Sequence, residues 1–187
     1  MNRKAIKRFE KAKRDCNLLD FDELNAMRVI KKLYADLEKD NKKTFLSLAG
    51  MAYMSASPHG NSKPTEKWIN ELLAEDDPVS LYIYLHEVTR KRDYTIEAVI
   101  AARDKPKEFR RGLSYWSRMT AHEADRMVDK ATLKAYRDAG IKKVRWITEH
   151  DNRVCDHCEP RDGKVYDIDK VPPKPHVHCR CWLLPAD

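Results

Sequence analysis

The chain has 187 residues, of which 36% are charged, and its formal net charge is +7. This length fits one ordinary domain, or a helical body followed by a small module. The longest weakly polar run, residues 45–54, is far shorter than the ~20 apolar residues of a membrane-spanning helix, so we expect no membrane insertion. Because apolar residues are scarce, we expect extended helices that bury surface against a partner, rather than a self-sufficient globule.

The first long helix is predicted after a short acidic segment. Residues 20–23 resemble a capping box, and apolar residues then recur at helical spacing from Leu24 to Leu37. This helix is expected to continue toward Gly50. Cys16, alone on an earlier predicted helix, is interpreted as a small apolar residue.

The middle of the chain predicts shorter helices. Residues 55–64 are rich in Gly, Pro, Ser and Asn and predict a loop, followed by a helix over 65–74. Pro78 favours the start of another helix, although the run 79–85 also alternates like a strand. Residues 94–103 predict a further short helix.

From Pro106 onward the helical pattern lengthens. One apolar stripe extends from Phe109 to Ala135, and the capping box at 120–123 predicts two helices that meet near Thr120. Gly140 is a stop signal. Beyond it, residues 143–148 predict the first strand of a small C-terminal module.

That module carries a dense group of soft ligands. Four of the five cysteines and three of the seven histidines lie within residues 155–181. Cys155 and Cys158 have CxxC spacing, which lets both sulfurs face one Zn²⁺ ion. Cys179 and Cys181 fall on one face of an extended segment, with Arg180 pointing away.

The identity of the four ligands stays open at this stage. Cys155 and Cys158 are the safest candidates, and Cys179 follows. The fourth position is contested between Cys181 and His176, which precedes Cys179 by three residues. The remaining histidines of the cluster, His157 and His178, are expected to flank the site.

Three other interpretations of the cysteines compete with structural zinc. Two disulfides are disfavoured because the charged N-terminus is no signal segment, which indicates a cytosolic origin. A catalytic metal is disfavoured because no H-E-x-x-H pattern supplies a general base. A chance cluster of four unliganded thiols is improbable. We therefore expect a closed, non-catalytic zinc site and no enzymatic activity.

The positive charge lies outside this module. Residues 1–15 hold seven basic and two acidic residues, and residues 103–118 hold six and two. Residues 151–187, in contrast, hold six basic and seven acidic residues. A zinc finger that reads DNA carries its basic residues on the module itself. Any contact with DNA is therefore expected from the helical body, chiefly from the basic N-terminal arm.

The C-terminal third resembles a known family. It combines a Trp-bearing strand at 144–147, the turn Asp151-Asn-Arg-Val-Cys155-Asp-His-Cys158, a Gly163-Lys-Val strand, and a closing Pro175-His-Val-His-Cys179-Arg-Cys181. This combination, over about residues 118–185, resembles the phage head-morphogenesis family of Mu F-like minor capsid proteins. The family motif falls on Cys155, Cys158, His176, Cys179 and Cys181.

The resemblance implies a structural minor head protein in the virion, near the portal vertex, assembled in the host cytoplasm. Its implied partners are the portal and other head proteins, and its implied role is head morphogenesis with DNA packaging or delivery. The expected fold is mainly α, with an extended helical body over residues 1–117 and a zinc-stabilised β module within 118–187. The chain ends soon after Cys181, so we expect no appended toxin or transferase domain.

Two other functions compete with a head role. A stand-alone zinc-stabilised DNA-binding protein would show salt-dependent binding to duplex DNA. A nuclease of the His-Asn-His type would need a catalytic histidine beside a ββα-metal motif, and the sequence offers no convincing set of partners for one.

Overall fold

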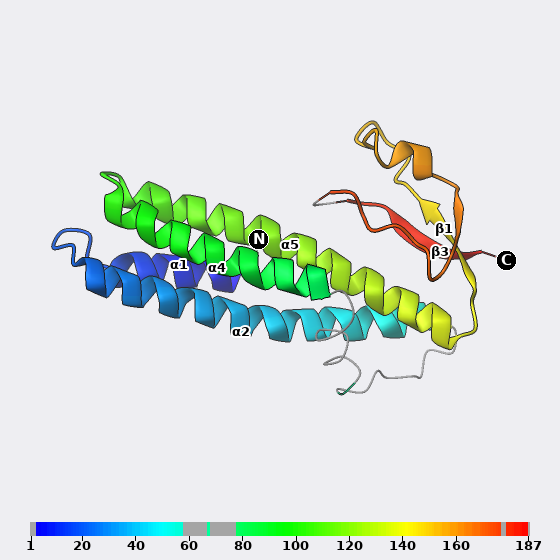
Figure 1. Cartoon of the computed structure of the whole chain (residues 1–187), viewed down its shortest axis with the longest axis horizontal. Coiled ribbons are helices and arrows are strands. Elements are labelled where there is room, and N and C mark those ends of the chain that lie inside the picture. The colour runs from blue at the N-terminus through cyan, green and yellow to red at the C-terminus, as the bar shows by residue number, and fades with distance from the viewer. Residues whose placement is uncertain (1–2, 58–66, 68–77, 177–178, 187) are drawn as a thin grey trace. The chain divides into compact units, whose positions relative to one another are not determined.

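The computed structural model describes residues 3–57, 67, 78–176 and 179–186. Four α-helices and a three-stranded antiparallel sheet are described (Figure 1). The chain divides into two compact units: residues 1–44 with 77–120, and residues 45–76 with 121–187. We refer to them as the helical unit and the sheet unit. Apart from residue 67, the predicted helix at 65–74 lies outside the described residues, as does most of the predicted loop at 55–64.

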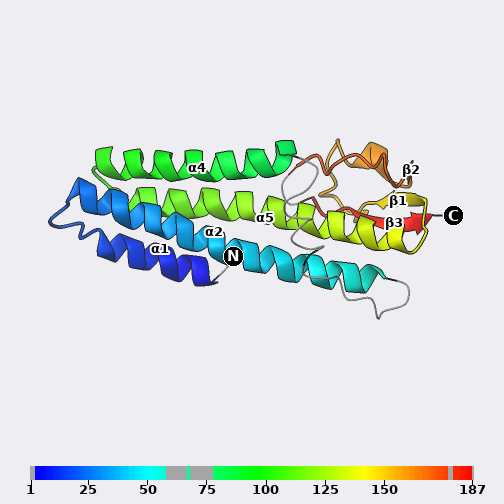
Figure 2. The same ribbon diagram turned by 60° about the horizontal axis from the view of Figure 1, so that its bottom comes forward.

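The helices are longer than the sequence predicts. α1 spans Arg3–Asp15, α2 spans Glu23–Ala56, α4 spans Pro78–Ala101 and α5 spans Lys105–Asp138 (Figures 1 and 2). Helices α2 and α5 each contribute one part to the helical unit and another to the sheet unit. The mainly helical fold with a small C-terminal sheet is therefore confirmed.

Three predicted boundaries were wrong. The cap of α2 is Asp22 rather than Asp20, because the Asp22 carboxylate accepts a bond from the Leu24 N–H at 3.0 Å. The two short helices predicted after Pro78 form the single helix α4, since no Gly or Pro interrupts residues 79–101, and the strand alternative there fails. Likewise α5 runs through Thr120, whose hydroxyl accepts a bond from Asn41 instead of capping a helix.

The helical unit has a core of its own, whereas the sequence led us to expect extended helices that bury surface against a partner. Its buried apolar side chains come from all four helices: Ala5, Phe9, Ala12, Ile30, Leu33, Tyr34, Leu37, Val88, Ile96, Val99, Phe109 and Trp116. Removal of apolar area on this scale from water is the main force that holds helices together. The apolar residues are few, but helical spacing places them on facing stripes.

All four helices of this unit meet in one group of side-chain contacts. The rings of Phe9 and Tyr34 meet edge to face at 6.2 Å, and the Tyr34 hydroxyl bonds the buried Thr95 hydroxyl at 2.9 Å. A Cβ on Gly112 would stand 3.3 Å from Phe9 and 3.2 Å from Thr95. Glycine thus lets α5 approach α1 and α4 closely.

The turn between α4 and α5 is closed by Lys105. Its ammonium donates to three carbonyl oxygens at the end of α4, those of Val99, Ile100 and Ala102, at 2.9–3.2 Å. It also lies 3.7 Å from the centre of the Phe21 ring. A cation at a helix C-terminus satisfies carbonyls that have no intrahelical partner.

In the sheet unit, α2 and α5 pack through small residues, Ala49 against Ala131 and Ala135, beside Tyr53. α5 ends as predicted at Gly140, where φ is +79°. The Ile141 N–H bonds the Tyr136 carbonyl and the Gly140 N–H bonds the Arg137 carbonyl, which is a Schellman ending.

The sheet has the order β2-β1-β3, formed by β1 Lys143–Ile147, β2 Val165–Asp167 and β3 Trp182–Ala186. The first two strands were predicted, and β3 was not. On one face Val144, Trp146 and Leu183 are buried together with Tyr136 of α5 and three cysteines of the candidate site. The buried face of the sheet therefore supports the predicted metal cluster.

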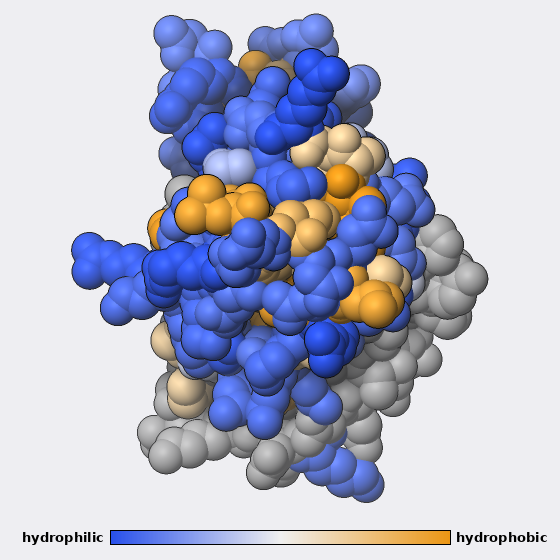
Figure 3. Space-filling model, turned by 90° about the vertical axis from the view of Figure 1, so that its left-hand side faces the viewer, coloured by the Kyte–Doolittle hydropathy of each residue, from blue (hydrophilic) through white to orange (hydrophobic). Residues whose placement is uncertain are grey.

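Most of the coloured side chains on the face shown in Figure 3 are hydrophilic. Figure 3 shows a face on which hydrophobic side chains form small groups among hydrophilic ones. None of the helices in the described part of the chain is both long and apolar enough to cross a membrane.

Candidate metal centre

The first half of the centre is a tight turn after β1. The N–H groups of Cys158 and Glu159 both bond the Cys155 carbonyl, at 2.8 and 3.0 Å. Cys158 then begins the 3₁₀ helix Glu159–Arg161, in which Pro160 fits the first turn because it needs no N–H donor there. This turn directs both sulfurs to one side, as CxxC spacing predicts.

The second half comes from His176, Cys179 and Cys181, which precede β3. His176 Nε2 lies 3.1 Å from Cys155 Sγ and 3.4 Å from Cys158 Sγ. Cys158 Sγ lies 3.6 Å from Cys179 Sγ. Ligand atoms around one tetrahedral ion, with Zn–S of about 2.3 Å and Zn–N of about 2.0 Å, have separations of this size.

All five predicted ligands lie in this cluster. Two groups of three have ligand atoms within 4.8 Å of one another: Cys155, Cys158 and His176, and Cys158, Cys179 and Cys181. Cys158 belongs to both groups, so the described residues could hold a metal ion with Cys158 at the centre of the donor set. His176 and Cys181 each belong to one of the two groups, so both keep their place as candidates for the fourth ligand.

The other predicted residues lie elsewhere. His157 is exposed and belongs to neither group. His178 lies outside the described residues. Cys16 is fully buried in the helical unit, and burial raises the pKa of its thiol to about 11.

The thiols of the centre differ in how readily they ionise. Burial raises the pKa of Cys158 and of Cys179. Burial also opposes ionisation of Cys155, but hydrogen bonds from Cys158 and His157 outweigh it and lower the pKa of that thiol. A metal ion bound beside these thiols would favour their thiolate forms. The donor set therefore fits a divalent metal whose binding releases protons.

An ion pair joins the two ligand-bearing segments. Arg180 donates two hydrogen bonds to the Asp151 carboxylate, at 2.6 and 2.7 Å. Asp151 also accepts a bond from the Arg153 N–H at 3.0 Å. Arg180 was expected only to point away from the cluster, so its bonds to Asp151 were missed. In the sequence, the feature that could have indicated this ion pair is Asp151, the acidic residue of the Asp-x-Arg turn.

Two further supports were not predicted. Asp162 accepts bonds from the Thr148 N–H and hydroxyl and pairs with His150, which fixes the turn after the 3₁₀ helix and lowers the pKa of Asp162. Lys174 forms an ion pair of 3.0 Å with Asp129 of α5 and fastens the segment that leads to His176.

A small cavity adjoins the cluster. Its volume is about 30 Å³, and its lining includes Glu149, Arg153, Cys155, His176 and Cys181. Such a cavity holds roughly one or two water molecules.

A comparison with known families gives a match that covers the candidate metal centre. Residues 96–184 match the family Phage Mu protein F like protein. This Mu F-like segment contains all five candidate ligands, and it begins within α4, at residue 96 instead of about 118. The family suggests a phage head-morphogenesis protein that works with other head proteins in the virion. The chain matches none of the curated proteins and none of the solved structures.

Proposed function

We propose that this chain is a structural minor head protein of a bacteriophage, associated with the portal, that acts in head morphogenesis and in DNA packaging or delivery. The observation that carries the proposal is the Mu F-like segment, whose C-terminal part folds into a sheet that presents the Cys/His cluster. The protein would be assembled in the host cytoplasm and reside in the virion near the portal vertex.

The metal is proposed to be Zn²⁺ in a structural role. Zinc prefers four thiolate and imidazole donors in closed tetrahedral sites. The sheet has only three short strands, and its buried face consists partly of cysteines. A module of this size depends on its metal, because structural zinc contributes about 10–16 kcal/mol of apparent binding energy in small peptides.

The proposal includes no enzymatic activity. Every member of the cluster is a thiol or an imidazole, which is typical of structural sites, and the adjoining cavity accommodates only water. A plasmid-nicking assay with added Mg²⁺ should give no nicked product. Metal-dependent nicking would favour the nuclease alternative.

Co-expression with the portal protein of the same phage tests the head role. We expect the chain to co-purify with the portal and to contain about one equivalent of zinc. A phage lacking the chain should give fewer filled heads. The proposal fails if the chain binds no portal and heads assemble and fill normally without it.

A further inference from the structure

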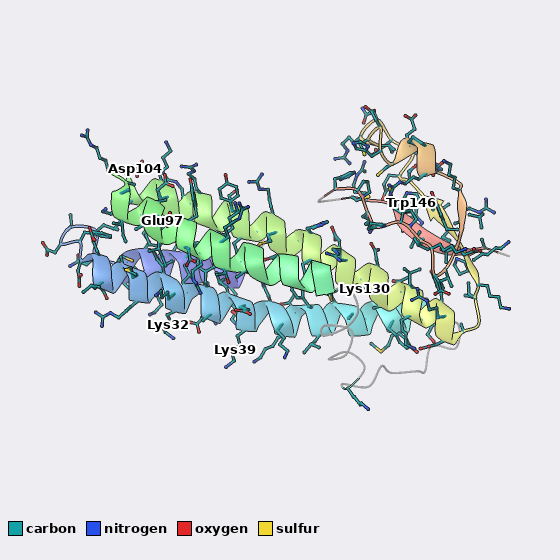
Figure 4. All side chains as sticks on the ribbon, viewed as in Figure 1. Lys32, Lys39, Glu97, Asp104, Lys130 and Trp146 are labelled. Atoms are coloured by element: carbon teal, nitrogen blue, oxygen red, sulfur yellow. The ribbon has the colours of Figure 1, made fainter. Side chains whose placement is uncertain are left out.

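The exposed face of α2 carries a row of basic side chains that lies outside both basic segments of the sequence. Six exposed residues form this row, which we name the α2 basic stripe: Arg28, Lys31, Lys32, Lys39, Lys42 and Lys43. At about 100° per residue they fall within a sector of about 120°, and they span about 22 Å of the helix axis. Figure 4 shows Lys32 and Lys39 projecting from the same side of α2.

Four of the seven basic residues of α1 form ion pairs, whereas this stripe is hardly neutralised. In α1, Lys4 and Arg8 bond Asp40 at 2.7 Å each, and Arg8 also pairs with Asp36 at 3.0 Å. Lys11 and Lys13 pair within their own helix. Within the described part of the chain, Lys32 is the one stripe residue with an ion-pair partner, Asp36 at 3.6 Å.

The acidic residues of α2 increase this contrast. Asp36 and Asp40 pair with cations of α1, which leaves the exposed Glu38 as the acidic residue beside the stripe, against its six basic side chains. Folding thus pairs α1 with α2 and leaves the lysines of α2 facing solvent. The N-terminal segment is also a packed helix, with Ala5, Phe9 and Ala12 buried, rather than a loose arm.

The composition of the stripe points to a duplex polyanion. Protein interfaces are depleted in lysine and favour aromatic residues and arginine. The stripe has five lysines and one arginine, and it has no aromatic residue on which the bases of a single strand could stack. Lysine ammonium groups suit a regular row of phosphates, where binding gains free energy from released counterions.

We infer that the α2 basic stripe binds the phosphate backbone of duplex DNA without sequence preference. The inference deepens the head role proposed above by naming the surface that meets DNA, but it requires neither portal binding nor zinc. It places the main contact on α2 rather than on the N-terminal arm that the sequence indicated.

The test is binding of the full chain to a labelled 30-bp duplex of random sequence, measured by fluorescence anisotropy over a range of salt. The double reversal Lys32→Glu/Lys39→Glu should weaken binding about tenfold or more at low salt. The milder Lys32→Gln/Lys39→Gln should reduce the salt slope by about two, one for each phosphate that the variant no longer neutralises. Circular dichroism and zinc content, unchanged in both variants, show that the fold is retained.

Two control pairs have the same charge change as the double reversal. Lys107→Glu/Arg110→Glu alters exposed residues of α5, and Lys7→Glu/Arg14→Glu alters exposed residues of α1. Both should keep duplex affinity within about twofold. An equal loss in either control, or no duplex binding at 50 mM salt, overturns the inference. Tight binding to poly-glutamate in place of the duplex would also overturn it, because the stripe would then fit an acidic protein. None of these results bears on portal co-purification, so the head role is judged separately.

Discussion

Arg180 and Asp151 form a two-bond ion pair that links the halves of the candidate metal centre. Arg180 stands between Cys179 and Cys181, while Asp151 precedes the Cys155 turn. The pair lowers the pKa of Asp151, chiefly through the hydrogen bonds from Arg180. A planar guanidinium fixes both distance and orientation, which a lysine at this position would not do.

We predict that Asp151→Asn weakens zinc binding about tenfold, because groups that orient metal ligands typically contribute a factor of about 10–100 to affinity. Competition with a chromophoric chelator measures the change. Asp167→Asn, which removes the exposed partner of Lys170 in the same sheet unit, is the matched control and should leave affinity unchanged. Equal affinities for Asp151→Asn and the unaltered chain would show that the ion pair does not position the ligands.

The shared position of Cys158 gives a second prediction. Cys158→Ser should abolish binding of a single equivalent of metal, because this sulfur belongs to both groups of ligand atoms. If four ligands bind, one of Cys181→Ser and His176→Asn should be tolerated far better than the other. Cobalt substitution reports the result, since its absorption bands count thiolate ligands. A Cys158→Ser variant that keeps full affinity would exclude this cluster as the metal centre.

Removal of the metal should loosen the sheet unit and leave the helical unit unchanged. Treatment with a strong chelator is expected to increase amide exchange in β1 and β3, whose buried face includes the cysteines, while the helical unit keeps its protection. The helical unit has its own buried core and needs no ligand from the centre. Simultaneous loss of protection in both units would contradict this separation.

The sequence predicted the cluster because cysteine and histidine spacing reports metal chemistry directly. The third strand was missed, since Trp182–Ala186 is short and Pro185 argues against a strand. The structure resolves this conflict through register. The N–H and the carbonyl of Trp146 form their hydrogen bonds on the side of β2. The residue of β3 that pairs with Trp146, Leu183, therefore turns its backbone groups away from β1, to the outer edge of the sheet. Pro185, two residues further along β3, has the same orientation. There the missing N–H of Pro185 breaks no ladder bond, and the Leu183 carbonyl accepts a bond from Tyr136.

The errors over helix length share another cause. Capping motifs such as 120–123 are local, and tertiary contacts decide whether a helix continues through them. Thr120 lies beside Asn41 of α2, which supplies its hydroxyl with a partner. The ion pairs of Asp40 with α1 likewise depend on residues more than 30 positions apart, which no local pattern reveals.

From the ion pairs of Asp40 we predict that the free energy of unfolding of the helical unit depends on pH. Burial opposes its ionisation, but Arg8 and Lys4 outweigh burial and hold the pKa of Asp40 below its usual value. A lowered folded-state pKa means that Asp40 stabilises the fold above its unfolded pKa of about 3.9, and that this contribution disappears as pH falls through the folded value.

Asp40→Asn should therefore destabilise the helical unit by about 1 kcal/mol at pH 7, a modest value because Lys4 is largely exposed to solvent. Thermal unfolding measured at pH 7 and at pH 3 should show a difference between variant and parent that shrinks with acid. A difference that is the same at both pH values would mean that charge pairing is not the cause.

The last prediction concerns Lys105, whose ammonium bonds the carbonyls at the end of α4. Lys105→Met keeps the length of the side chain but removes three hydrogen bonds to the end of α4 and the cation over Phe21. Because the carbonyls of Val99, Ile100 and Ala102 lose a charged donor, we expect a loss of about 1–2 kcal/mol in the free energy of unfolding. Lys107→Met, an exposed neighbour on the same helix, should change stability by less than about 0.5 kcal/mol. Urea denaturation followed by circular dichroism compares the two variants. Equal stabilities would show that water satisfies these carbonyls as well as the ammonium does.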